Sequence, residues 1–223
     1  MDDLPPADGG LPLDSGIEPQ ALGEAVEAEP LDTTLVEPTD QALEDAFETQ
    51  EPAMIEAVDH DVEVYGFADS GLWNDQDVEG FVEDNIPPEH LTNLDNITYD
   101  GSDQAREEGV LGEWSEDLSD RNHICVYPHD DADEMRWTVA HEVGHNAQDA
   151  VVGWDSDLAR EWTDLHEQSQ ECVSAYAETG PEEDFAECYS AYINDPPLLS
   201  KVNPEKYDFL CDHVFNGREY WAR

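Results

Sequence analysis

The residues with the clearest chemical meaning are His141, Glu142 and His145, which form the pattern His-Glu-x-x-His. Residues four apart lie one turn apart on the same face of an α-helix, so the two histidines can offer imidazole nitrogens to one metal ion. Glu142 would lie beside the open side of that ion, where a carboxylate can take a proton from a bound water molecule. The pattern therefore predicts a hydrolase that uses Zn2+, although a motif this short also occurs by chance.

A catalytic zinc ion usually has three protein ligands and one open position, so a further ligand must come from elsewhere in the chain. The extended metzincin pattern, His-x-x-Gly-x-x-His, is excluded because Gln148 and Val151 occupy its glycine and histidine positions. Glu161 and Glu167, on the next expected helix, are two alternatives. A glutamate downstream of the motif is therefore the expected third ligand.

Glu183 and Glu187 are a stronger pair of candidates because they are four residues apart on one face of an expected helix. One carboxylate can bind the metal while the other accepts the N–H of a ligating histidine and so fixes its tautomer. Like charges one turn apart repel each other, and a bound cation would relieve that repulsion. In so acidic a chain the two can also be ordinary surface glutamates, and their spacing does not decide which one binds the metal.

The segment from Glu183 to Tyr189, Glu-Asp-Phe-Ala-Glu-Cys-Tyr, resembles the Glu-Phe-Phe-Ala-Glu-Ala-Phe segment of the anthrax-lethal-factor-like zinc metallopeptidases. These are gluzincins, to which the clostridial Pro-Pro endopeptidases are related. Residues 124–128, Ile-Cys-Val-Tyr-Pro, resemble the strand that precedes the active-site helix in such domains. The resemblance covers roughly residues 55 to 220. The other domains of lethal factor have no counterpart here, so neither toxin action nor a substrate is implied.

The resemblance implies a zincin-like peptidase domain with Zn2+ as cofactor and with Glu183 as the third zinc ligand. It also implies a catalytic role for Tyr176, seven positions before Glu183, which can donate a hydrogen bond to the developing oxyanion. Glu187 would orient one histidine, or bind the metal itself if the register of the helix is shifted by one turn. We therefore expect a zinc endopeptidase, with Glu142 as general base. The alternatives are a zinc-binding domain without peptidase activity and an interaction protein whose motif is accidental.

The charge balance narrows the partners and the source. The chain has 57 Asp and Glu against 8 Lys and Arg, a net charge of −49. A surface this acidic depends on screening by salt and predicts a halophilic source. It argues against nucleic acids and anionic membranes, since both attract positive charge. There is no run of about eighteen apolar residues and no signal peptide at the N-terminus. We expect a cytoplasmic monomer that acts on a peptide or protein, or an extracellular one if an export segment has been removed.

The expected fold class is α+β, with a small antiparallel or mixed sheet, an active-site helix and C-terminal helices. Residues 1–52 are expected to be an acidic disordered tail with a short helix at 41–49, and residues 53–223 the catalytic domain. Alternation of apolar residues predicts strands at 62–67 and 97–99 and an antiparallel hairpin that joins 109–114 to 123–127. We expect the substrate to lie along an edge strand, the one ending near Tyr127.

The helices are predicted from caps, prolines and apolar spacing. Asn74 and Asp131 are expected N-caps, the second of them for a motif helix over 132–151. Gly144 in that helix predicts close approach of another backbone. Further helices are expected from Ser156 toward Cys172, after Pro181 up to Pro196-Pro197, and over 204–215. Tyr189 and Tyr192 are expected core residues.

The remaining histidines and the cysteines carry weaker signals. No Cys-x-x-Cys pair is present, so a zinc ribbon is not expected, while buried thiols and one or two disulfides both remain open. The four cysteines are Cys125, Cys172, Cys188 and Cys211. The histidines outside the motif are expected to be surface or core residues and not ligands, with His129, just ahead of the motif helix, the least certain. They are His60, His90, His123, His129, His166 and His213.

Overall fold

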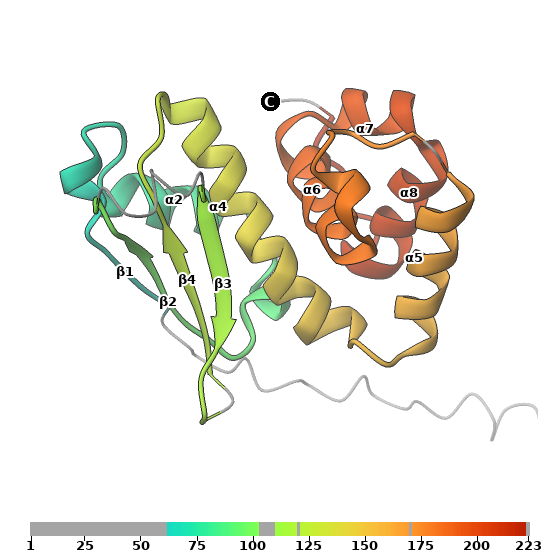
Figure 1. The fold of residues 1–223 in the computed structure, drawn as a ribbon, viewed down its shortest axis with the longest axis horizontal. Helices are drawn as coiled ribbons and strands as arrows, with labels where there is room; N and C mark the ends of the chain where they lie inside the picture. Colours follow the sequence, from blue (N-terminus) through green and yellow to red (C-terminus); the bar gives the residue numbers. More distant parts are fainter. Residues whose placement is uncertain (1–61, 103–109, 120, 170, 222–223) are drawn as a thin grey trace, which may run out of the picture. The chain divides into compact units, whose positions relative to one another are not determined.

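The computed structural model describes residues 62–102, 110–119, 121–169 and 171–221. The expected tail over 1–52, with its short helix at 41–49, lies outside the described residues. Residues Met54–Arg223 form one compact unit. Its described part combines a small mixed sheet with several helices (Figure 1), which confirms the expected α+β class.

The sheet has four strands in the order β1-β2-β4-β3. Strands β1 (Glu63–Tyr65), β2 (Leu94–Tyr99) and β4 (Asn122–Val126) are parallel, and β3 (Gly112–Glu116) pairs with β4 in the antiparallel sense. The expected hairpin is therefore confirmed. Its turn is shorter than expected, because the polar residues at the end of β3 still pair with β4 across a solvent-exposed part of the sheet.

The strand that ends near Tyr127 is β4, and it is an inner strand of the sheet. The expectation that this strand forms an edge was wrong, because β2 pairs with one side of it and β3 with the other. Among the described strands, β3 forms the edge on this side. Any strand added here would pair with β3.

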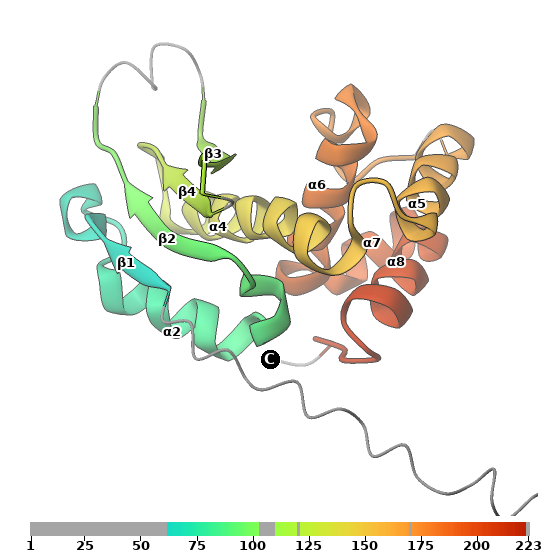
Figure 2. The same ribbon diagram turned by 90° about the horizontal axis from the view of Figure 1, so that it is seen from below.

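Helix α2 (Asp75–Asn85) begins after Asn74, as expected. The Asn74 side chain accepts hydrogen bonds from two backbone N–H groups of the first turn. The Asp77 carboxylate in turn accepts one from the Asn74 backbone N–H. Val78 and Val82 on its inner face are buried. Figure 2 shows the helix alongside β1.

Helix α4 (Ala132–Ala147) runs between the sheet and the C-terminal helices (Figure 1). Asp131 caps its first turn, and a π-helical turn over Gln148–Val152 continues it to the expected end. One face carries Met135, Val139 and Val143, which are fully buried. The helix is thus fixed by one apolar face, and the neighbouring face is left for the histidines.

Four further helices follow α4 in the chain. Helix α5 begins after Ser156, as expected, and the Ser156 side chain caps it, but α5 stops at Gln168, four residues before Cys172. Each of the three helices after α5 begins with a proline. The backbone N–H that proline lacks would have no partner within the helix at this first position. The helix after Pro181 ends at Asn194, just before Pro196-Pro197 as expected, and these prolines also begin the helix that follows. These helices are α5 (Asp157–Gln168), α6 (Pro181–Asn194), α7 (Pro196–Val202) and α8 (Pro204–Phe209), the last continued by a π-helical turn over Leu210–Val214.

Helix α6 packs directly across α4 at Gly144. A Cβ at Gly144 would lie 3.0 Å from Cα of Ala186 and 3.1 Å from Cβ of Tyr189. The close backbone approach expected at this glycine is confirmed. The rings of Tyr189 and Tyr192 are fully buried, as expected, and all four cysteines are free thiols. No helix of the described residues has the length and apolar character needed to cross a membrane.

Candidate metal centre

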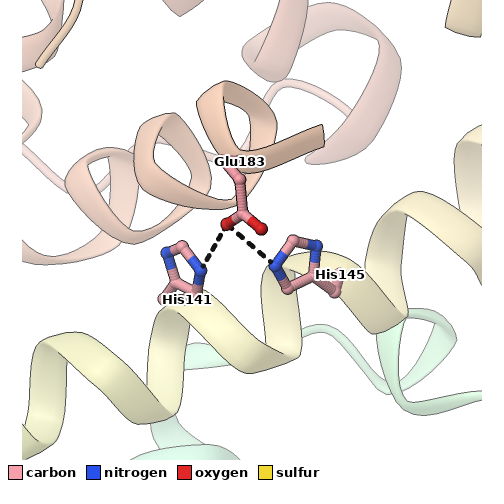
Figure 3. Close-up of side chains that lie close together, drawn as sticks. All are labelled: His141, His145 and Glu183. Atoms are coloured by element: carbon pink, nitrogen blue, oxygen red, sulfur yellow. Dashed lines mark ion pairs between the residues drawn. The ribbon is translucent and has the colours of Figure 1, made fainter. Parts of the chain in front are cut away.

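His141 and His145 project from one face of α4 toward the first turn of α6, which carries Glu183. Figure 3 shows the Glu183 carboxylate facing both imidazoles. Its Oε2 atom lies 3.2 Å from Nε2 of His141 and 3.4 Å from Nε2 of His145. One potential ligand atom from each of the three residues falls within 4.8 Å of the others. The crossing of α4 and α6 at Gly144 thus brings together a group that could hold a metal ion.

The Oε2 atom of Glu183 is buried and has no hydrogen-bond partner among the described residues. Both imidazoles are at ion-pair distance, but neither directs a ring N–H at this oxygen with hydrogen-bond geometry. The two imidazoles, His141 first, hold the pKa of the Glu183 carboxyl well below its usual value. A buried, charged oxygen without a donor is costly unless a cation compensates it. This is the strongest indication of a bound cation.

The second ring nitrogen of His141 is held by Glu187, one turn after Glu183 on α6. Nδ1 of His141 lies 2.8 Å from Oε1 of Glu187, so this nitrogen carries the proton shared with the carboxylate and Nε2 faces Glu183. Burial lowers the pKa of His141, but its contacts with Glu183 and Glu187 outweigh burial and raise the pKa to about 9. Glu187 can therefore orient His141, and it is not one of the three potential ligands that lie close together.

The side chains of Trp137 and Ser174 also lie near Glu187 and favour its charged form, and neither was singled out from the sequence. Burial raises the pKa of the Glu187 carboxyl, but the contact with His141 and the influence of these two side chains lower it below its usual value. Trp137 lies one turn before His141 on α4, a spacing that could have indicated it. Ser174 lies in an irregular segment and had no sequence signal.

Glu142 is almost fully buried between α4 and the edge strand β3, with 5% of its surface exposed. Burial is the largest influence on its carboxyl and raises the pKa. A Cβ at Gly112 of β3 would overlap Oε1 of Glu142 and lie 2.9 Å from its Cδ. A carboxylate with a raised pKa is a better proton acceptor near neutral pH, so Glu142 is suited to act as a base.

Tyr176 stands over the same site from the segment before α6. Its ring centroid is 5.8 Å from that of His141, and 53% of the side chain is exposed. Burial of the hydroxyl and the nearby Glu183 carboxylate raise the pKa of Tyr176, so it stays a proton donor at neutral pH. The side chain is close enough to reach a substrate lying over His141.

Two cavities meet over these residues, and both are lined by Gly112, His141, Glu142 and Tyr176. The larger cavity, about 420 Å³, extends beneath apolar side chains. The smaller cavity, about 310 Å³, extends beneath two indole rings and acidic groups. The apolar wall is formed by Val110, Leu111 and Trp137. The other wall contains Glu113, Trp114, Trp154 and Glu183. A chain passing over Glu142 would have room for a side chain on each side.

The histidines outside the motif lie apart from this group where they are described, and His60 lies outside the described residues. Nδ1 of His129 donates a hydrogen bond to Tyr127 O, and Nε2 shares one with Thr138 Oγ1, both at 2.7 Å. His90 is fully buried, and burial lowers its pKa to about 4. Both are engaged in the core as expected.

A second group that resembles a metal site is formed by His166, Cys172 and Asp184, behind the first turn of α6. Here the ammonium of Lys206 lies 2.6 Å from Oδ2 of Asp184, with both side chains fully buried. A lysine ammonium already supplies the positive charge, and a dication beside it would be repelled. This group is therefore an ion-pair cluster.

Comparisons with protein-family models and with curated proteins find no match to this chain. The function is therefore inferred from the geometry of the site and from the sequence motifs.

Proposed function

We propose that the chain is a zinc-dependent endopeptidase with a zincin-like domain, in which His141, His145 and Glu183 hold the metal. The observation that carries the proposal is the buried Oε2 of Glu183, which faces two imidazole nitrogens and has no hydrogen-bond donor among the described residues. Ligand atoms about 2.1 Å from a tetrahedral zinc ion lie about 3.4 Å apart. The two nitrogen–oxygen distances of 3.2 and 3.4 Å fit that spacing.

The donor set also favours zinc over other ions. Two imidazoles and one carboxylate are the ligands of several zinc peptidases, whereas calcium and magnesium prefer oxygen donors alone. Zinc bound there would act as a Lewis acid that lowers the pKa of a water molecule to about 7 and polarises a substrate carbonyl. His141 must lose its proton from Nε2 to become a ligand, and Glu187 then keeps the remaining proton on Nδ1.

Glu142 and Tyr176 have separate tasks in the proposed reaction. Glu142, buried beside both histidines, accepts a proton from the attacking water and later returns it to the leaving amine. Tyr176 keeps its proton at neutral pH and donates a hydrogen bond to the oxyanion, a contribution worth roughly 2.7–4 kcal/mol for a well-placed donor.

The edge strand β3 offers a place for the substrate backbone. Leu111 and Asp117 exchange hydrogen bonds with β4, as shown by the bonds from Tyr127 N to Leu111 O and from Asp117 N to Arg121 O. Because bonding alternates along an antiparallel pair, the backbone groups of Gly112 and Trp114 point away from β4. An extended peptide pairing with them would run past Glu142, with side chains entering the two cavities.

The decisive experiment combines metal analysis with digestion of a peptide library by wild type and by Glu142→Gln, in molar salt because of the net charge of −49. We expect one zinc per chain in both proteins and cleavage by the wild type alone. If both proteins bind zinc and neither cleaves any peptide, the result would favour a zinc-binding domain without peptidase activity. Absence of stoichiometric zinc would favour an accidental motif, and equal cleavage by both would contradict the role of Glu142.

A further inference from the structure

The ion pair between Lys206 and Asp184 lies directly behind the candidate metal centre. Asp184 follows Glu183 in the first turn of α6, and the two carboxylates point in different directions, Glu183 to the histidines and Asp184 into the helical core. Lys206 comes from α8. It is one of only two lysines in the chain, and its side chain is fully buried.

Both oxygens of Asp184 are engaged by several elements. Oδ2 lies 2.6 Å from Nζ of Lys206 and 3.1 Å from Nδ1 of His166 on α5. Oδ1 accepts a weak hydrogen bond from the thiol of Cys188, 3.6 Å away and one turn further along α6. The carboxylate is therefore held by three helices at once. Few of the described carboxylates are buried, and Asp184 is fully buried beside a matching cation.

The first turn of α6 needs such contacts because its own sequence does not cap it. No side chain of the described residues caps the N-terminus of α6 at Gly180, whereas Asn74, Asp131 and Ser156 cap α2, α4 and α5. Instead, the Trp162 indole donates a hydrogen bond to Pro181 O at 2.8 Å. The Asp184 carboxylate is a second polar contact that joins this turn to the neighbouring helices.

We propose that Lys206 and Asp184 are positioning residues for the metal centre: their ion pair fixes the first turn of α6 and thereby the Glu183 carboxylate. The proposal rests on the proposed function, since it concerns the residue assigned as third zinc ligand. Replacing a buried ion pair by apolar side chains often leaves stability unchanged, so stability alone does not explain a buried pair. The ion pair of 2.6 Å with Lys206 fixes the position of Oδ2 of Asp184. Apolar side chains in the same place would not do so, because apolar packing is not directional.

The test measures zinc affinity, by competition with a chromophoric chelator, and the visible absorption spectrum of the Co2+-substituted protein. Lys206→Met is compared with Lys201→Met, which removes the exposed lysine on α7. We expect Lys206→Met to weaken zinc binding roughly 10- to 100-fold and to change the cobalt spectrum, as for other residues that orient metal ligands. Lys201→Met should match the wild type in both measurements.

Lys206→Met can fail to fold because it leaves the buried Asp184 carboxylate without its cation. The double variant Asp184→Leu/Lys206→Met removes both charges and should fold with nearly wild-type stability in the metal-free state. Weaker zinc binding and an altered cobalt spectrum in this folded variant would support a positioning role. Wild-type affinity and spectrum in it would overturn the role and leave the zinc site intact. Failure of the wild type itself to bind zinc would overturn both the proposed function and this inference.

Discussion

The backbone of Gly112 on the edge strand lies directly against the carboxylate of Glu142 on α4. A Cβ at Gly112 would overlap Oε1 of Glu142 and come within 2.8 Å of Cγ2 of Thr138. The expected proton acceptor is therefore held between a helix and a strand, with no side chain of the strand in between. The absence of a side chain at Gly112 is what makes this contact possible.

Gly112→Ala should lower kcat/KM about 100-fold, since a displacement of about 1 Å at a catalytic group can cost that much. Zinc content should stay at the wild-type level, because the three atoms nearest the new Cβ belong to Glu142 and Thr138 and none to a proposed ligand. Gly80→Ala on α2 is the matched control, where a Cβ meets no atom of the described residues within 4 Å. Wild-type kcat/KM in Gly112→Ala would show that Glu142 does not need this approach.

Gly144→Ala should destabilise the protein even though alanine is the better helix former. The change gains about 1 kcal/mol of helix propensity. The new Cβ, however, would lie 3.0 Å from the Ala186 backbone and 3.1 Å from Cβ of Tyr189, and overpacking of this kind costs roughly 1–3 kcal/mol. We expect a net loss of roughly 1 kcal/mol in urea unfolding of the metal-free protein.

Gly80→Ala should have the opposite effect on the free energy of unfolding in the same measurement. It lies inside α2 in open space and should gain up to about 1 kcal/mol from helix propensity alone. A stabilised Gly144→Ala would mean that α6 can move away from α4 at little cost. In that case zinc affinity should fall, because Glu183 would move with α6.

The parts of the fold that depend on local sequence could be predicted. Asn74, Asp131 and Ser156 cap helices because each side chain satisfies backbone groups a few residues away. The apolar stripe of α4 and the close approach at Gly144 likewise follow from spacing within one helix. The spacing of Glu183 and Glu187 also predicted a pair in which one carboxylate faces the metal and the other orients a histidine. In the structure each contacts a different nitrogen of His141.

The parts that depend on contacts between distant segments could not be predicted. Which strand forms the edge is decided by the pairing of β2 with β4, and no local pattern near Tyr127 encodes it. The approach of Gly112 to Glu142 joins residues 30 apart in sequence, and the pair of Asp184 with Lys206 joins residues 22 apart. A single lysine or glycine does not indicate which distant residue it will meet.

Trp137→Phe should weaken zinc binding roughly tenfold, the lower end of the range for residues that orient a metal ligand. The change keeps most of the ring but removes the indole N–H, which favours the charged form of Glu187, and Glu187 in turn orients His141. Chelator competition measures the effect. Trp154→Phe is the control, since its indole donates to Asp149, 2.7 Å away, and should leave zinc affinity unchanged. Equal affinities in the two variants would contradict the role of Trp137.

The metal-free protein should lose stability as the pH rises from about 6.5 to 9. The pKa of His141 is raised in the folded state from 6.5 to about 9, so its protonated ring stabilises the fold fully below pH 6.5, and that contribution is lost as the pH rises through 9. The pKa of Glu183 is lowered from its usual value of 4.5, so the ionised carboxylate stabilises the fold above pH 4.5. That contribution is lost as the pH falls through the lowered pKa. Zinc competes with the same proton on His141, so zinc affinity should rise over the range in which metal-free stability falls.

Urea unfolding in a chelating buffer at several pH values between 6.5 and 9 measures this dependence. His141→Asn is the control, because it removes the titrating ring and should flatten the slope in that range. With saturating zinc, the wild type should instead gain stability with rising pH, because ligand that binds only the folded state adds its binding free energy. A metal-free wild type whose stability is constant or increases from pH 6.5 to 9 would show that His141 is not held protonated by Glu183 and Glu187.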